Sequence, residues 1–261
     1  MRKIVLLAGL LVTMVTFRVA AQDDYLYHHD RDYYFKRFNA LNSAILKGGV
    51  KKDAFVKQFD TLFHAMYTFD AMKSTIIIPP YPNQWVFPLK GYKVSAIGGN
   101  GDGYSDKGYH FLDGNKHTAH PAHDIFIRDK NQDCIDDHTN KPVDVLAVRD
   151  GWVVACSDTW DINSNLRGGK YIWIFHPKDL SGRPEGLKGG YFTYYAHNSA
   201  IFVKPGDEVR PGQKIAEVGR TGYNAYKKRS PTHLHFSAFR LVDDIPVPFN
   251  PYQQLKKAKT L

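Results

Sequence analysis

A proline-rich break at Pro79-Pro80-Tyr81-Pro82 divides this chain of 261 residues into two parts with different hydrophobic patterns. After the break, short runs of β-branched and aromatic residues alternate with clusters of Gly, Asn and Asp, and no helical period separates them. These runs are 144–148, 151–155, 171–175, 191–195, 214–218 and 234–239. Strands at this spacing predict a mainly β domain over residues 79–252, built as a compact antiparallel β-sheet or sandwich.

The segment before the break, 22–78, has the periodicity of a small α-helical hairpin. One apolar face is formed by Tyr34, Phe38, Leu41 and Ile45, and Gly48-Gly49 ends that pattern. Asp53 is predicted to be the N-cap of a second helix. Its apolar face contains Phe55, Phe59, Leu62, Met66 and Phe69. Both faces need a partner, so we expect the hairpin to pack against the rest of the chain.

The first 21 residues are typical of a secretory signal peptide. Arg2 and Lys3 precede an apolar run over residues 4–17, and Val19-Ala20-Ala21 supplies small residues for cleavage. We therefore expect export to the periplasm or the extracellular space and no membrane span in the mature protein, with an uncleaved anchor as the alternative. No cysteine follows the run, so a lipid anchor is not expected.

Composition and charge exclude some functional classes. With 43% hydrophobic residues the chain is not expected to be disordered. The net charge is +9, and +6 after removal of residues 1–21, which contain three basic and no acidic residues. This charge suits an anionic cell envelope. No dense basic stripe with aromatic residues predicts nucleic-acid binding, and the basic tail over 253–261 is expected to be solvated. The oligomeric state stays open.

Three short histidine motifs suggest a metal site. His120-x-x-x-Asp124 combines two good zinc ligands, and their even separation places both on one face of an extended backbone. In His233-Leu234-His235 both imidazoles share one strand face while Leu234 points to the core. Spacing alone leaves open whether both bind metal or one handles protons. His197 ends an aromatic strand, where acid–base chemistry is plausible. Zinc hydrolases use three protein ligands and leave one position for water.

At this point the sequence resembles the lysostaphin/LytM-type family of zinc endopeptidases, over about residues 85–240. The three motifs, with Tyr195-Ala196 before His197, stand in the family's order. The glycine-containing run 203–222 between the last two is similar to the family's strand–turn–strand segment.

The resemblance implies one zinc ion per chain, held by His120, Asp124 and His235, with His197 and His233 as catalytic histidines. It also implies the duplicated hybrid motif fold, and peptidoglycan peptides as the substrate of an endopeptidase. Degenerate members that lack metal ligands act as binders or hydrolase activators, which is the alternative function for this chain.

Some features depart from the family pattern or lie beyond it. Ala122 replaces a glycine, and His123 is an extra histidine expected to point away from the metal. A loop with Lys227, Lys228 and Arg229 is a candidate for lining the groove, with plain solvation as the alternative. His28 or His29 of the helical segment is a candidate for approaching the metal in a latent form, with a packing role of that segment as the alternative. An insert over 129–142 spaces oxygen atoms as calcium loops do. The candidate calcium ligands are Asp129, Asn131, Asp133 and Asp137, and a polar turn without calcium is the alternative, because Cys134 stands where such a loop has glycine.

Other classes fit less well. A swinging-arm carrier domain needs a lysine on an exposed hairpin, and none is found in the Gly206 to Gln213 turn. No nucleophile-elbow pattern indicates a serine hydrolase. Cys134 and Cys156 have no helix-start setting that would lower a thiol pKa. Whether they form a disulfide is left open, because sequence does not give their separation.

Overall fold

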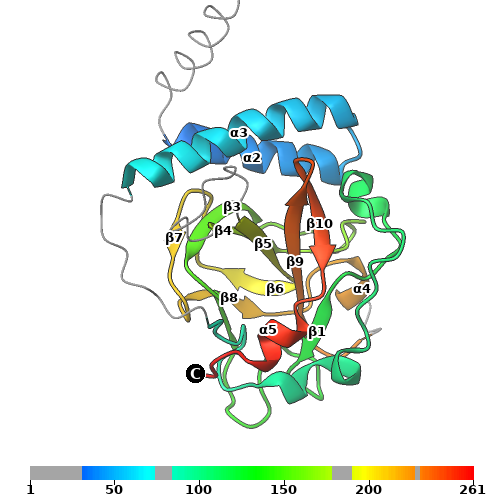
Figure 1. The fold of residues 1–261 in the computed structure, drawn as a ribbon. Coiled ribbons are helices and arrows are strands. Elements are labelled where there is room, and N and C mark those ends of the chain that lie inside the picture. The colour runs from blue at the N-terminus through cyan, green and yellow to red at the C-terminus, as the bar shows by residue number, and fades with distance from the viewer. Residues whose placement is uncertain (1–30, 74–83, 178–189, 227–229) are drawn as a thin grey trace, which may run out of the picture.

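The computed structural model describes residues 31–73, 84–177, 190–226 and 230–261. These residues form three layers, with a helical hairpin above a seven-stranded sheet and a three-stranded sheet below it (Figure 1). The predicted signal peptide and the Pro79–Pro82 break lie outside the described residues. Among the described helices, none combines the length and the apolar character needed to cross a membrane.

The seven-stranded sheet is antiparallel throughout, as predicted from the spacing of the strands. Its order is β1 (His123–Phe126), β9 (His233–Val242), β5 (Gly190–Ala196), β4 (Tyr171–Pro177), β3 (Gly151–Ser157) and β7 (Glu208–Val209), with β10 (Ile245–Phe249) also paired to β9. β9 is the longest strand of this sheet, and it pairs along one edge with β1 and then β10 and along its other edge with β5.

A second, smaller sheet closes the main core. It consists of β2 (Asp144–Leu146), β8 (Lys214–Val218) and β6 (Asn198–Ile201). Side chains alternate along the large sheet, so that Ile172, Ile174 and Leu234 point toward the small one and are fully buried. Val145 and Ala216 of the small sheet complete this core. The predicted inward orientation of Leu234 is confirmed.

The helical hairpin covers the opposite face of the large sheet. It consists of α2 (Arg31–Leu46) and α3 (Lys52–Lys73), and α2 ends just before Gly48, whose φ of 75° suits a glycine. The predicted apolar faces are buried as far as their side chains are described, which leaves out Met66 and Phe69. Phe38 and Phe59 pack against each other, and both contact Phe192 of β5. Trp152 contacts Phe35 in the same way. The hairpin is therefore joined to the sheet by an aromatic core.

Three details differ from the sequence-based expectations. Asp53 lies in the first turn of α3, after its first residue Lys52, and is not the N-cap. β10 was not predicted, because Pro246 and Pro248 lack the N–H groups that a strand normally uses. The C-terminal segment exposes its lysines but is not a free tail. It forms α5 (Tyr252–Lys256), buries Leu255 and pairs its backbone at Lys259 with Trp85 and Phe87.

The remaining described elements are short. They are the 3-10 helices Val94–Ala96, Gly98–Gly101 and Phe111–Lys116, and the helix α4 (Tyr223–Tyr226).

We predict that Phe59→Ala lowers the free energy of unfolding by about 3–5 kcal/mol, because it empties a site in the aromatic core where Phe59 is 1% exposed. Chemical denaturation measures this loss. The exposed Lys57, on the same helix, supplies a matched control, and Lys57→Ala should change stability by less than about 0.5 kcal/mol. Equal stability of the two variants would show that the hairpin does not pack on the sheet in solution.

Candidate metal centre

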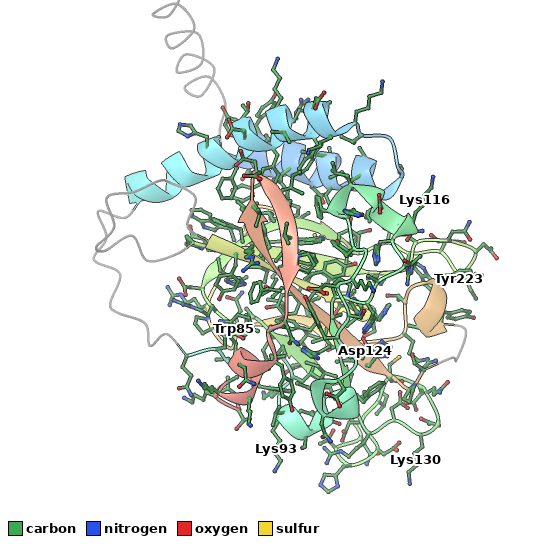
Figure 2. All side chains as sticks on the ribbon, turned by 45° about the vertical axis from the view of Figure 1, so that its right-hand side comes forward. Trp85, Lys93, Lys116, Asp124, Lys130 and Tyr223 are labelled. Atoms are coloured by element: carbon green, nitrogen blue, oxygen red, sulfur yellow. The ribbon has the colours of Figure 1, made fainter. Side chains whose placement is uncertain are left out.

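The candidate site lies on the same face of the large sheet as the helical hairpin. His235 and Phe239 are four residues apart on β9, so they share a face, and Phe239 belongs to the core under the hairpin. Asp124 of β1 is paired directly with His235, and Ala196 of β5 pairs with His235 on its other side. The hairpin and the site therefore occupy neighbouring parts of one face. Figure 2 shows Asp124 below the hairpin, with Tyr223 of α4 to its right.

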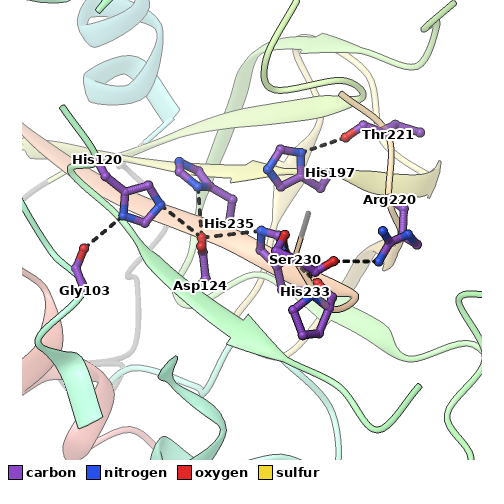
Figure 3. Close-up of polar contacts among 10 residues, drawn as sticks. Gly103, His120, Asp124, His197, Arg220, Thr221, Ser230, His233 and His235 are labelled. Atoms are coloured by element: carbon purple, nitrogen blue, oxygen red, sulfur yellow. Dashed lines mark hydrogen bonds and ion pairs between the residues drawn. The ribbon is translucent and has the colours of Figure 1, made fainter. Parts of the chain in front are cut away.

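Five residues predicted from the sequence meet at this place (Figure 3). His120 Nε2 lies 3.3 Å from Asp124 Oδ1, and His235 Nδ1 lies 3.1 Å from the same oxygen. Two ligands about 2.1 Å from one zinc ion at the tetrahedral angle are about 3.4 Å apart, so these separations suit a single ion. Among the described residues, these three are the only group of three or more His, Cys, Asp or Glu side chains whose ligand atoms lie within 4.8 Å of one another.

The other two histidines lie beside this group. The rings of His197 and His233 are 4.9 Å apart, and the ring of His197 is 5.5 Å from that of His235. His233 Nε2 lies 3.6 Å from Asp124 Oδ1. The side chain of His233 is 5% exposed, so it is presented to the cavity and hardly at all to bulk water.

Three of the imidazoles are oriented by backbone carbonyl groups. The Nδ1 atoms of His120, His197 and His233 lie 3.0, 2.7 and 2.7 Å from the carbonyl oxygens of Gly103, Thr221 and Pro231. A carbonyl oxygen only accepts hydrogen bonds, so each Nδ1 carries the proton and donates. In the neutral ring, Nε2 is then left with its lone pair, ready to bind a metal or a proton.

Electrostatics keep the carboxylate ionised and the inner imidazoles neutral. Burial raises the pKa of Asp124, but hydrogen bonds with His120 and His235 outweigh burial and hold this pKa far below its usual range. The hydrogen bond to Asp124 raises the pKa of His120. Burial lowers the pKa values of His235 and His197. Neutral imidazoles and an ionised carboxylate are the forms that bind a metal.

The backbone at His197 is held in an uncommon conformation. Its φ is 68°, in the left-handed region that few residues other than glycine adopt, although histidine is among those that do. The His197 N–H donates to the carbonyl of Gly168 at 3.0 Å. Such a conformation persists when the surroundings enforce it, and it is often found at functional sites. Here it turns the chain from β5 into β6 and places the imidazole in the cavity.

A network of polar groups fixes the start of β9, where His233 stands. Thr232 is fully buried, and its hydroxyl donates to Asp129 Oδ2 at 2.6 Å. The guanidinium of Arg220 donates to the carbonyls of Ser230 and Ala225 at 2.9 and 2.8 Å. Sequence reasoning missed Arg220 and Thr221, because a supporting contact to a loop carbonyl has no sequence signal.

The insert that was predicted to bind calcium uses its acidic residues in another way. Asp129 accepts hydrogen bonds from the backbone amides of Asp133 and Cys134 as well as from Thr232. Asn131 donates to Asp133, and Asp137 accepts from the amide of Lys130. Within the described residues, Asp129, Asp133 and Asp137 do not form a group of converging ligand atoms. The carboxylates instead stabilise the turns of the insert.

Other predicted features can also be placed. His123 points away from the site, since its Nε2 lies 2.8 Å from Asn250 Oδ1. Cys134 and Cys156 are both free thiols. Lys227, Lys228 and Arg229, like His28 and His29, lie outside the described residues.

The five residues open into a cavity of about 180 Å³. Its wall also includes His117, Arg167, Gly168 and Tyr194, which the sequence did not single out. A second cavity of about 60 Å³ lies between this wall and the end of α2, with His235 and Tyr194 on one side and Asn42 and Ile45 on the other. The described part of the hairpin thus contributes to the surroundings of the site and does not line the cavity of the five residues.

Comparison with known proteins agrees with this arrangement. Residues 130–247 match Peptidase family M23, a segment that contains three of the five histidine and aspartate residues and begins after His120 and Asp124. The murein hydrolase activator NlpD of Salmonella dublin is 35% identical over 100 residues, which are 37% of this chain and 22% of NlpD. The lipoprotein YgeR of Escherichia coli is 35% identical over 88 residues, 33% of this chain and 31% of YgeR. The chain thus spans less than a third of either relative.

Among solved structures, the catalytic domain of lysostaphin from Staphylococcus simulans is 25% identical, with a TM-score of 0.34 over 55% of this chain and 81% of that domain. A zinc-containing peptidase from Vibrio cholerae is 24% identical, with a TM-score of 0.36 over 68% of this chain and 41% of the peptidase. The match of residues 130–247 to Peptidase family M23 supports the LytM-type family that the sequence resembles.

Proposed function

We propose that this protein is a zinc-dependent endopeptidase that hydrolyses peptide bonds in bacterial peptidoglycan, after export from the cytoplasm. One observation carries the proposal: in an M23 domain, two imidazoles and a carboxylate converge within 4.8 Å, beside two further oriented imidazoles. A site for structural zinc is usually closed by four protein ligands, whereas a catalytic site offers three. The set of three therefore supports catalysis.

The donor set fits a divalent cation. Within the described residues Asp124 has no lysine or arginine partner, and its ion-pairing neighbours are the imidazoles of His120, His233 and His235. No described side chain therefore supplies a permanent positive charge to this partly buried carboxylate, which suits the binding of a cation. When bound at His120, Asp124 and His235, zinc would polarise a peptide carbonyl and lower the pKa of a water molecule to about 7.

His197 and His233 are proposed to handle protons. Their Nδ1 atoms donate to backbone carbonyls, so each Nε2 is free to accept a proton from the attacking water or to donate one to the leaving amine. Their positions are fixed from outside the site by Thr221 and Pro231, so little reorganisation is needed when a peptide binds.

Peptidoglycan as the substrate is supported by the family resemblance and by the relatives. NlpD is named for murein hydrolase activation, which associates an M23-like segment with the cell wall in that protein. The expected signal peptide and the positive charge of this chain agree with action on an anionic envelope.

A second function is favoured by the same relatives. A segment similar to NlpD could activate a separate murein hydrolase by contact instead of cutting peptides itself. The two functions make different demands on the site, because an activator does not need intact proton-handling histidines.

We predict that the purified chain binds one zinc ion, and that His120→Ala, Asp124→Ala and His235→Ala each weaken zinc binding at least 100-fold by removing one of three ligands. Metal analysis after dialysis and a thermal melt with and without chelator measure this. His138→Ala changes an exposed histidine of the insert and should retain full zinc content. Unaltered zinc content in all three site variants would refute the proposed ligand set.

We predict that residues 22–261 release peptide fragments from purified peptidoglycan and that chelation stops the release. His197→Asn and His233→Ala should reduce the rate by about 10²–10⁴-fold while zinc stays bound. Asparagine is chosen at 197 because it tolerates the left-handed backbone found there. Mass spectrometry of the fragments identifies the bond. If peptidoglycan stays intact but a partner hydrolase is stimulated equally by wild type and both variants, the activator function replaces the enzymatic one.

A further inference from the structure

We propose that Arg167 binds a free carboxylate of the substrate peptide and so selects acidic stem peptides over uncharged cross-bridges. The inference rests on the proposed function in one respect, namely that the cavity receives cell-wall peptides. Arg167 lies on the wall of the same cavity as the five residues of the candidate site.

The wall of the cavity contains two residues with a permanent or ionised charge. Among the described residues lining the cavity, Arg167 is the one permanent cation and Asp124 the one carboxylate. Asp124 is already engaged by three histidines. No acidic side chain on this wall is therefore left to receive the guanidinium, so the positive charge of Arg167 is available to a ligand.

The hydrogen bonds of Arg167 leave donors of its guanidinium available. Its guanidinium donates from one terminal nitrogen to the carbonyl oxygen of His117. Within the described part of the chain, no carboxylate lies within 4 Å of it. A guanidinium has five N–H donors in a fork that matches a carboxylate, so donors remain for a ligand on this half-buried residue.

The loop that holds Arg167 is fixed on both sides. The Arg167 amide donates to Asn115 Oδ1 at 2.8 Å, and Asn115 donates to the carbonyl of Asn165 at 2.8 Å. The neighbouring carbonyl of Gly168 accepts the amide of His197, and a Cβ at Gly168 would collide with the hydroxyl of Tyr194. Arg167 is thus attached to the same short segment that positions a proposed catalytic histidine. A cation so placed is preorganised for a charge close to the scissile bond.

This arrangement distinguishes two kinds of cell-wall peptide. A stem peptide has free carboxylates near its peptide bonds, whereas a bridge made only of glycine has none on its side chains. A charge-assisted, bidentate pair with a carboxylate favours the first kind by about 10- to 100-fold. Arg167 has no signal in the sequence, since a single arginine in a loop is usually solvated.

The test measures binding separately from hydrolysis. A stem tetrapeptide with free carboxylates and its fully amidated form are titrated calorimetrically into the full chain with chelator present, so that neither is cut. Wild type should bind the free acid about 10- to 100-fold more tightly than the amide. Arg167→Gln should remove this preference, and Arg167→Lys should retain part of it because the charge is kept. Arg210→Gln, an exposed arginine that does not line the cavity, should leave it unchanged.

The outcomes separate this inference from the proposed function. Equal binding of the two peptides by wild type, no binding of either, or an unchanged preference in Arg167→Gln overturns the role of Arg167. A preference that depends on Arg167, together with no hydrolysis when zinc is restored, supports the role of Arg167 and overturns the enzymatic function. With hydrolysis present, the Arg167→Gln loss should appear in KM for the free acid and leave kcat within about threefold.

Discussion

The antiparallel pairing of β9 with β1 on one side and β5 on the other is the constraint on which this site depends. It places His235 directly between Asp124 and Ala196, and so joins residues that are 111 positions apart in the chain. Slippage by one residue would turn both histidines of β9 into the core and Leu234 out of it. The register is therefore secured by the same buried alternation that forms the main core.

That core also explains why the site can be polar and still fixed. Asp124, His233 and His235 stand on regular strands, and His197 directly follows β5. The Nδ1 atoms of His120, His197 and His233 are hydrogen-bonded to backbone carbonyls of surrounding loops. Positions set by backbone groups vary little, which suits the proposed three-ligand site. The helical hairpin packs on the same face of the sheet, next to the site, where it lies beside Tyr194 and Phe239.

Much of this arrangement could be predicted from the sequence, because the signals were local. The alternation around Leu234 placed two histidines on one face, and the four-residue period from Tyr34 predicted a buried helix face. β10 was not predicted, because its two prolines are untypical of a β-strand. Asp129 illustrates the limit of arguments from spacing. It stands in a calcium-like pattern, but its carboxylate accepts hydrogen bonds from a turn amide and from the hydroxyl of Thr232. Contacts from loops to the site, such as those of Arg167 and Arg220, depend on tertiary folding and produce no periodic pattern in the sequence.

X-ray absorption spectroscopy of the full chain with one equivalent of zinc tests the central claim most directly. Two imidazoles and one carboxylate predict a first shell of nitrogen and oxygen at about 2.0–2.2 Å, with the multiple-scattering pattern of about two histidines. Asp124→Ala should lower the number of oxygen neighbours while both histidines remain. A shell that contains sulfur at about 2.3 Å, or one without imidazole scattering, would contradict the assignment of His120, Asp124 and His235 as the metal centre.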